Sequence, residues 1–133
     1  MTAKTPDTKG KTILYANCEQ GMADYISGIL KGRYNVIITC DAVETLNILQ
    51  GEQDIAVVIS DLPVAISVAL FAEIKTIRPH CKVMLLTSHL DVDAAKHAIE
   101  QGAINKYLTR PWNKKRLQRQ SMSWLRRITP PKD

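Results

Sequence analysis

A short apolar run that ends at an acid constrains the fold of this chain more than any other feature. Residues Ile55 to Ser60 read IAVVIS, and Asp61 follows directly. An uninterrupted run of about four to eight apolar, β-branched residues is typical of a central strand in a parallel sheet. Open α/β sheets bind ligands just beyond the carboxyl ends of their strands, which is where Asp61 lies. Asp61 is therefore either a functional acid or the N-cap of a helix with Pro63 in its first turn.

The same alternation of a short apolar run and a helical stretch repeats along the chain. Turn signals such as Gly32, Gly51 and Gly102 separate the segments. We expect strands at 12–16, 34–39, 54–61, 82–87 and 105–109, and helices at about 20–31, 41–50, 64–77, 91–101 and 112–128. Five strands that alternate with five helices predict an α/β fold with a doubly wound, five-stranded parallel sheet and helices on both faces.

The third expected helix is apolar on every face in its first half. The 3.6-residue spacing predicts that its inward positions are Val68, Phe71 and Ile74. The same spacing predicts an outer apolar face of Ile66, Ala69 and Leu70. A contiguous exposed apolar group often marks a contact surface, so we expect self-association or partner docking there. The alternative is that neighbouring loops cover this helix.

The size of the chain fits a single domain. Its 133 residues are 45% hydrophobic, and a chain of this length buries about two thirds of its unfolded surface in one core. Its apolar stretches fall short of the roughly 18 residues of a membrane span, and its N-terminus has no apolar signal region. We expect a disordered lead-in over residues 1–11, a domain over 12–128 and a tail over 129–133. We also expect a cytoplasmic location and no membrane partner.

Cysteine usage argues against both a disulfide framework and a structural zinc site. Cys18, Cys40 and Cys81 are odd in number, widely spaced and without a Cys-x-x-Cys pair, so we expect reduced thiols. A mixed transition-metal site formed by Cys18, Asp61 and His89 is a weaker alternative, because these ligands have no tight spacing.

Parallel strands would bring several polar side chains to one edge of the sheet. The expected strand ends place Asn17 and Cys18, Asp61, Thr87 with Ser88, and Arg110 along that edge. An acid, two hydroxyls and a cation would then surround a single pocket.

Three stretches of the chain resemble a known family. They are Val57–Asp61 (VVISD), Val83–Ser88 (VMLLTS) and Gly102–Trp112 (GAINKYLTRPW). Through them, residues 12 to about 128 resemble a receiver domain of the two-component response regulators. The resemblance implies a flavodoxin-like (βα)5 fold with strand order 2-1-3-4-5. It also implies a signalling module, not an enzyme, with a histidine kinase or phosphotransfer protein upstream and a protein partner downstream.

The resemblance assigns roles by position. Asp61 matches the phosphoaccepting aspartate, Thr87 the hydroxyl that binds the phosphoryl group and Tyr107 the switch aromatic. Arg110 stands where the family has lysine. A guanidinium fork can hold an unmodified carboxylate through two hydrogen bonds, so we expect a resting pair of Asp61 and Arg110.

The chain departs from the family where magnesium binds. The family has an acidic pair after its first strand that holds Mg²⁺ together with the phosphoacceptor, and this chain has Asn17 and Cys18 there. An amide and a thiol are poor substitutes for two carboxylates as Mg²⁺ ligands. The loop after Asp61 is also about two residues shorter than in the family, with Pro63 two positions early. We therefore expect a doubtful Mg²⁺ site and a module that is weakly phosphorylated or independent of phosphorylation.

Two alternatives remain at this stage. The first is a conventional Mg²⁺-dependent phosphoaccepting receiver. The second is a nucleic-acid-binding module, because residues 112–133 hold seven basic side chains against one acid. The second alternative has no aromatic interleaving and no recognisable helix-turn-helix in its favour.

Overall fold

The computed structural model describes residues 12–17, 19–30, 34–51 and 54–110. A five-stranded parallel sheet has the order β2-β1-β3-β4-β5. Its strands are β1 (Thr12–Ala16), β2 (Asn35–Thr39), β3 (Ile55–Ser60), β4 (Lys82–Ser88) and β5 (Lys106–Arg110). The helices are α1 (Gln20–Leu30), α2 (Ala42–Leu49), α3 (Val64–Ile77) and α4 (Val92–Glu100), with a 3₁₀ turn, η2 (His89–Asp91), before α4. The predicted fold class and strand order are confirmed, and the helix expected at 112–128 lies outside the described residues.

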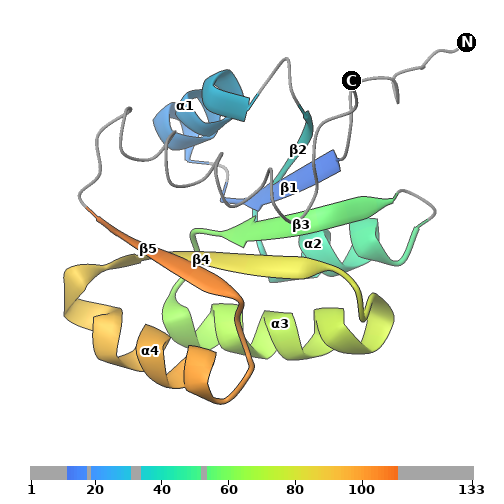
Figure 1. Ribbon diagram of the computed structural model, residues 1–133. Helices are drawn as coiled ribbons and strands as arrows, with labels where there is room; N and C mark the ends of the chain where they lie inside the picture. The colour runs from blue at the N-terminus through green and yellow to red at the C-terminus, as the bar shows by residue number, and fades with distance from the viewer. Residues whose placement is uncertain (1–11, 18, 31–33, 52–53, 111–133) are drawn as a thin grey trace, which may run out of the picture.

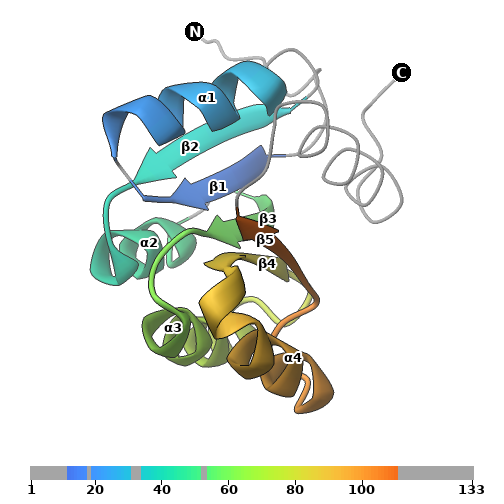
Figure 2. The same ribbon diagram turned by 90° about the vertical axis from the view of Figure 1, so that its left-hand side faces the viewer.

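Helices cover both faces of the sheet. Helix α1 lies on one face, and α2, α3 and α4 lie on the other (Figures 1 and 2). Two apolar clusters fill the space between these layers. The cluster beneath α1 includes Ile13, Tyr15, Val57, Ile59 and Met84. The cluster beneath α2–α4 includes Leu14, Val58, Phe71, Ile74 and Leu85. Because the central strands are buried on both faces, β3 and β4 read as continuous apolar runs.

The register between β1 and β3 places the acid that follows β3. Tyr15 lies opposite Ile59, and Ala16 lies opposite Ser60. The backbone N–H of Asp61 donates to the carbonyl oxygen of Ala16 at 3.1 Å, so the ladder continues one residue beyond β3. Asp61 is therefore held at the carboxyl edge of the sheet by its own backbone.

The inner face of α3 differs from the predicted one. Phe71 and Ile74 are fully buried, as predicted, and Ile66 and Ala69 face outward. Leu70, predicted to face outward, is 2% exposed. The buried residues of α3 are Ser67, Leu70, Phe71 and Ile74, a helical stripe that begins at a serine. A helix that is apolar on every face gives no strong indication of its inner side, and the polar Ser67 hid the true stripe.

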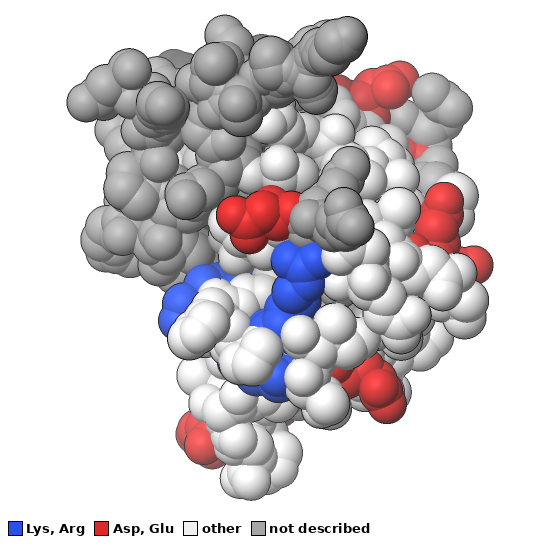
Figure 3. All heavy atoms as spheres, turned by 90° about the vertical axis from the view of Figure 1, so that its right-hand side faces the viewer, with Lys and Arg blue, Asp and Glu red and all other residues white. Residues whose placement is uncertain are grey.

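Arg78, which follows α3, forms hydrogen bonds at the end of the sheet opposite to Asp61, where the strands begin. Its Nε donates to the carbonyl oxygen of Leu49 at 3.0 Å, and its Nη2 donates to that of Gly51 at 2.8 Å. These bonds satisfy carbonyl groups at the C-terminus of α2 and fasten α2 to α3. Figure 3 shows this end of the molecule, where Lys and Arg side chains lie beside Asp and Glu side chains. Its described surface therefore carries both signs of charge.

The cysteines behave differently from one another. Cys81 is a free thiol, 3% exposed, in the cluster beneath α2–α4. Burial raises the pKa of Cys81 to about 11, although Arg78 and Lys75 lower it. Cys40, by contrast, is disulfide-bonded, so the expectation of reduced thiols is wrong at this position. Parallel pairing joins the ends of strands that are distant in sequence, as the 2.9 Å bond from Asn17 N–H to Thr39 O shows. Sequence spacing was therefore a poor guide, and Cys18 lies outside the described residues.

Helices long and apolar enough to cross a membrane do not occur in the part of the chain that the structure describes.

Candidate functional site

The connection from β3 to α3 is a tight turn of three residues. Helix α3 begins at Val64, and its N-cap is Pro63, which supplies no side-chain hydrogen bond. The interpretation of Asp61 as the N-cap is therefore wrong. Two buried hydroxyls close the turn instead, because Ser60 Oγ and Ser67 Oγ are 2.7 Å apart and Ser67 Oγ donates to the carbonyl oxygen of Leu62 at 3.1 Å. A serine at the end of the strand and a serine in the first turn of the helix thus define this short loop.

The carboxylate of Asp61 is directed toward the sheet. Asp61 is 7% exposed, and its Oδ2 accepts a 2.7 Å hydrogen bond from the phenol of Tyr15. Tyr15 and Ile59 are partners across the strands, so Tyr15 and Asp61 are diagonal neighbours on the same face of the sheet. An aromatic side chain is long enough to bridge that diagonal. The acid at the end of β3 is thus anchored through its side chain as well as its backbone.

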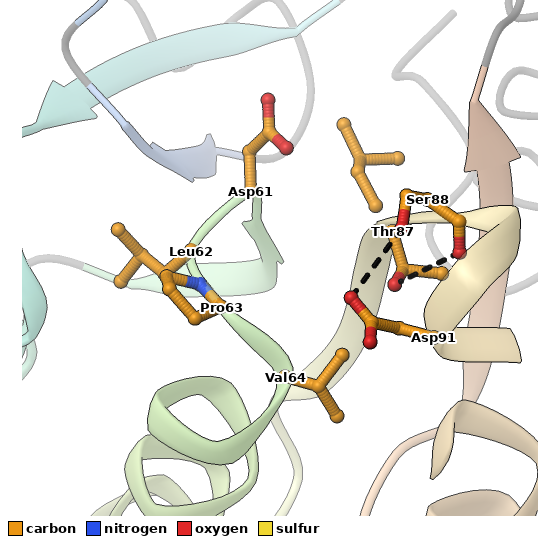
Figure 4. A pocket seen from close by; sticks show the side chains of 8 residues that line it. Asp61, Leu62, Pro63, Val64, Thr87, Ser88 and Asp91 are labelled. Atoms are coloured by element: carbon orange, nitrogen blue, oxygen red, sulfur yellow. Dashed lines mark hydrogen bonds between the residues drawn. The ribbon is translucent and has the colours of Figure 1, made fainter. Parts of the chain in front are cut away.

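Asp61 borders a pocket of about 210 Å³ at the carboxyl edge of the sheet. The apolar lining residues are Leu62, Pro63, Val64 and Leu86. The polar lining residues are Asp61, Thr87, Ser88 and Asp91. Figure 4 shows the Asp61 carboxylate turned away from Thr87, Ser88 and Asp91. The pocket therefore combines apolar side chains with the hydroxyls of Thr87 and Ser88 and the carboxylate of Asp91.

The hydroxyls of Thr87 and Ser88 make only long hydrogen bonds. Thr87 is 4% exposed, and its Oγ1 donates to the carbonyl oxygen of Ser88 at 3.5 Å. Ser88 Oγ donates to Asp91 Oδ2 at 3.4 Å. Both distances are long for hydrogen bonds from hydroxyls, so these groups can turn toward a ligand at little cost. Thr87 and Asp61 line one pocket, as the sequence predicted.

Asn17 uses both ends of its amide within the loop. Its Nδ2 donates to the backbone carbonyl of Asp61 at 3.2 Å, and its Oδ1 accepts from the N–H of Glu19 at 2.9 Å. Asn17 therefore fixes the backbone beside Asp61. Cys18, which follows Asn17 and replaces the second acid of the family's magnesium site, lies outside the described residues. Groups of three or more His, Cys, Asp or Glu side chains able to hold a metal do not occur among the described residues.

Two predicted site residues lie on β5. Arg110 ends the strand opposite Ser88, which brings its backbone to the pocket edge, while its side chain is outside the described part of the structure. Tyr107 is half-buried against the cluster beneath α2–α4. The pair of Asp61 with Arg110 and the switch role of Tyr107 remain predictions.

Sequence reasoning missed Tyr15 and Asp91 as members of this site. The sequence places Tyr15 within the strand at 12–16 and Asp91 at the start of the helix at 91–101, where an aspartate serves as a helix cap. Asp91 is at the N-cap of α4 but makes no side-chain capping bond there. One signal was available for Tyr15, because it is two residues before Asn17 and so shares a face of β1 with the predicted site.

Known proteins share the fold of this chain. The family model of the response regulator receiver domain matches residues 13–121. A response regulator receiver domain protein from Clostridium thermocellum is 29% identical with a TM-score of 0.74, covering 88% of this chain and 95% of that one. A signal receiver domain of an HD domain-containing protein from Pseudomonas fluorescens Pf-5 is 25% identical with a TM-score of 0.75, covering 96% and 93%.

Structural similarity extends to more distant sequences. An adenylate cyclase structure from Rhodopirellula baltica has a TM-score of 0.79 at 16% identity and covers 89% of each chain, which shows the shared fold alone. No curated protein matches the chain in sequence.

Proposed function

Since the chain belongs to the response regulator receiver domain family, we propose that it is a signalling module that acts by protein contact, with little or no dependence on phosphorylation of Asp61. It performs no reaction on a substrate. Its pocket retains the acid and the hydroxyl expected of a receiver, but its surroundings disfavour phosphoryl transfer.

The observation that carries this proposal is the use of Asn17. In the family this position holds a carboxylate for Mg²⁺, whereas here an amide is committed to the backbone groups of Asp61 and Glu19. The carboxylate of Asp61 is turned toward Tyr15. Mg²⁺ requires several oxygen ligands in near-octahedral geometry. The residues described around the pocket do not fit this ion, since they include no group of three or more His, Cys, Asp or Glu side chains that could hold it.

Phosphoryl transfer depends mainly on positioning and on cations that offset the charge developing on the equatorial oxygens. A pocket without a divalent cation loses that stabilisation. In the proposed mechanism the resting arrangement is the active one. Asp61 is held by Tyr15 and, as a further part of the proposal, by Arg110, which occupies the sequence position of the family's lysine.

Exposed apolar side chains close in sequence to pocket residues support a contact role. Leu90 in η2 is 84% exposed, and Ile66 in α3 is 47% exposed. Both are close in sequence to pocket residues, since Val64 and Asp91 line it. We propose that a protein partner, or a second copy of this chain, binds across this mouth of the pocket. The test compares Leu90→Glu with Lys96→Glu, a control at an exposed polar position, by light scattering and by partner binding. Equal self-association and equal partner binding of the two variants would exclude this contact surface.

A conventional phosphoaccepting receiver is the second candidate. Its support is that Asp61 and Thr87 line one pocket. Intact mass after incubation with acetyl phosphate and Mg²⁺ separates the two functions, with Asp61→Asn as the control for the modified residue. The proposed function predicts little or no mass gain in the parent protein. Stoichiometric gain that Asp61→Asn abolishes would overturn it in favour of the second candidate.

A further inference from the structure

The phenol of Tyr15 is placed in an unusual position for a polar group. Tyr15 is fully buried within the cluster beneath α1, among Ile13, Val57 and Ile59. Phenylalanine would fill the same volume without carrying a hydroxyl into the core. A buried hydroxyl is costly unless it is hydrogen-bonded, and this one bonds to the functional acid of the pocket. The hydroxyl thus has a use beyond packing.

The bond constrains the carboxylate of Asp61. A hydrogen bond of 2.7 Å to a carboxylate oxygen is in the range of strong, charge-assisted bonds. It engages lone-pair density on Oδ2 and fixes the rotation of the carboxylate. The other oxygen, Oδ1, is shielded from solvent. One carboxylate oxygen is therefore engaged by the phenol, and the other is not exposed to solvent.

We propose that Tyr15 is a positioning residue that holds Asp61 in an unreactive orientation toward acyl phosphates. This inference rests on the proposed function, in which Asp61 occupies the phosphoacceptor position of a poorly phosphorylated receiver. In the reaction at issue, an Asp61 oxygen attacks phosphorus and forms an O–P bond. The O–P bond of the acyl phosphate breaks, and the carboxylate leaving group departs with the electron pair. Attack requires the carboxylate to leave the phenol first.

Two separate features would then suppress phosphorylation. The replacement of the acidic pair by Asn17 and Cys18 weakens Mg²⁺ binding. The hydrogen bond from Tyr15 keeps the nucleophilic carboxylate of Asp61 from attacking. Restoring the acids alone would leave the second feature in place. Breaking a hydrogen bond to a charged group before attack slows a reaction by roughly ten- to a hundredfold.

The experiment uses a variant with Asn17→Asp and Cys18→Asp, in which both family acids are restored. It is compared with the same protein carrying Tyr15→Phe in addition. A third protein carries Tyr34→Phe instead, which removes another buried phenol hydroxyl from the same cluster. All are incubated with acetyl phosphate, Mg²⁺ and a thiol reductant, and intact mass is followed over time. We expect Tyr15→Phe to accelerate modification of the restored protein by at least about tenfold, and Tyr34→Phe to leave the rate unchanged.

Equal rates with and without Tyr15→Phe would overturn the inference, as would equal acceleration by Tyr34→Phe. Failure of the proposed function has a different signature, namely rapid modification of the parent protein. A second measurement does not depend on the restored background. In the parent, the Tyr15 hydroxyl proton should give a downfield, slowly exchanging NMR resonance that Tyr15→Phe removes and Asp61→Asn shifts upfield. A Tyr15 resonance that is insensitive to Asp61→Asn would also contradict the inference.

Discussion

Tyr15 and Asp61 are 46 residues apart in sequence and are joined by a 2.7 Å hydrogen bond within the sheet. The bond exists because β1 and β3 are neighbours and pair with Tyr15 opposite Ile59. Asp61, two residues beyond Ile59, is then the next polar group on the same face. The acid at the strand end is thus held by the neighbouring strand before any ligand or partner arrives.

This bond should contribute measurably to stability. Tyr15→Phe keeps the ring and removes only the hydroxyl, so we expect the free energy of unfolding at neutral pH to fall by about 1.5–3 kcal/mol, the range for a hydrogen bond to a charged group. Urea denaturation checks this value. In a double-mutant cycle with Asp61→Asn, the two changes should not add. Strict additivity would mean that the bond is absent in solution.

Magnesium should have almost no effect on the folded protein. With weak binding, a concentration near the dissociation constant adds only about 0.4 kcal/mol to stability. Without the two family carboxylates the protein should bind Mg²⁺ too weakly to be stabilised at this concentration. We therefore expect the parent to unfold at the same temperature in about 10 mM MgCl₂ as in NaCl of equal ionic strength. The variant with Asn17→Asp and Cys18→Asp should gain stability with Mg²⁺. A saturating shift in the parent would contradict the proposed lack of a site.

Arg110 should stabilise the folded protein by compensating the charge of the buried Asp61 carboxylate. Its backbone ends β5 opposite Ser88, and a carboxylate at 7% exposure requires compensation of its charge. Arg110→Ala should lower the free energy of unfolding by about 1–3 kcal/mol, and Arg110→Lys should recover only part of the loss. Lys106→Ala, at the start of the same strand, is the control. An unchanged denaturation midpoint for Arg110→Ala would show that no such pair forms.

The buried thiol of Cys81 should make stability fall at high pH. Its pKa is raised from 9.0 to about 11 in the folded protein. Between these values the unfolded chain loses the thiol proton while the folded chain keeps it, so unfolding becomes more favourable as pH rises. The full loss is about 2–3 kcal/mol at pH values above the folded pKa. Denaturation of the parent and of Cys81→Ala from pH 8.5 upward checks it, and parallel pH profiles for the two would exclude this contribution.

Two apolar residues in the first half of α3 should respond differently to truncation. Leu70 is 2% exposed, whereas Ile66 is 47% exposed. Leu70→Ala should lower the free energy of unfolding by about 2–5 kcal/mol, the range for creating a cavity in a core. Ile66→Ala should cost well under half as much, since much of its surface is already in water. Similar losses at both positions would mean that α3 is rotated relative to the structure described above.

Particular residues show how far sequence reasoning reached. The strands were predictable because a buried parallel strand such as β3 must be apolar on both faces. The edge that gathers Asp61 and Thr87 followed from parallel pairing alone. The bond from Tyr15 to Asp61 depends on which strands are neighbours and in which register, and periodicity within one strand contains neither fact. Leu70 was misplaced because α3 is apolar all round, and the Cys40 disulfide was missed because distance along the chain was taken for distance in space.

The hydroxyl bridge between Ser60 and Ser67 makes loop length and residue identity interdependent. Each serine is fully buried, and each depends on the three-residue turn to reach the other. The usual family loop is about two residues longer. Inserting two residues here would move α3 away from β3 and leave two hydroxyls without hydrogen-bond partners in an apolar interior. Replacing only one serine would leave the hydroxyl of the other without this hydrogen-bond partner. A change toward the common loop therefore has to alter both serines together with the length, so single substitutions or insertions along that path pass through a destabilised protein.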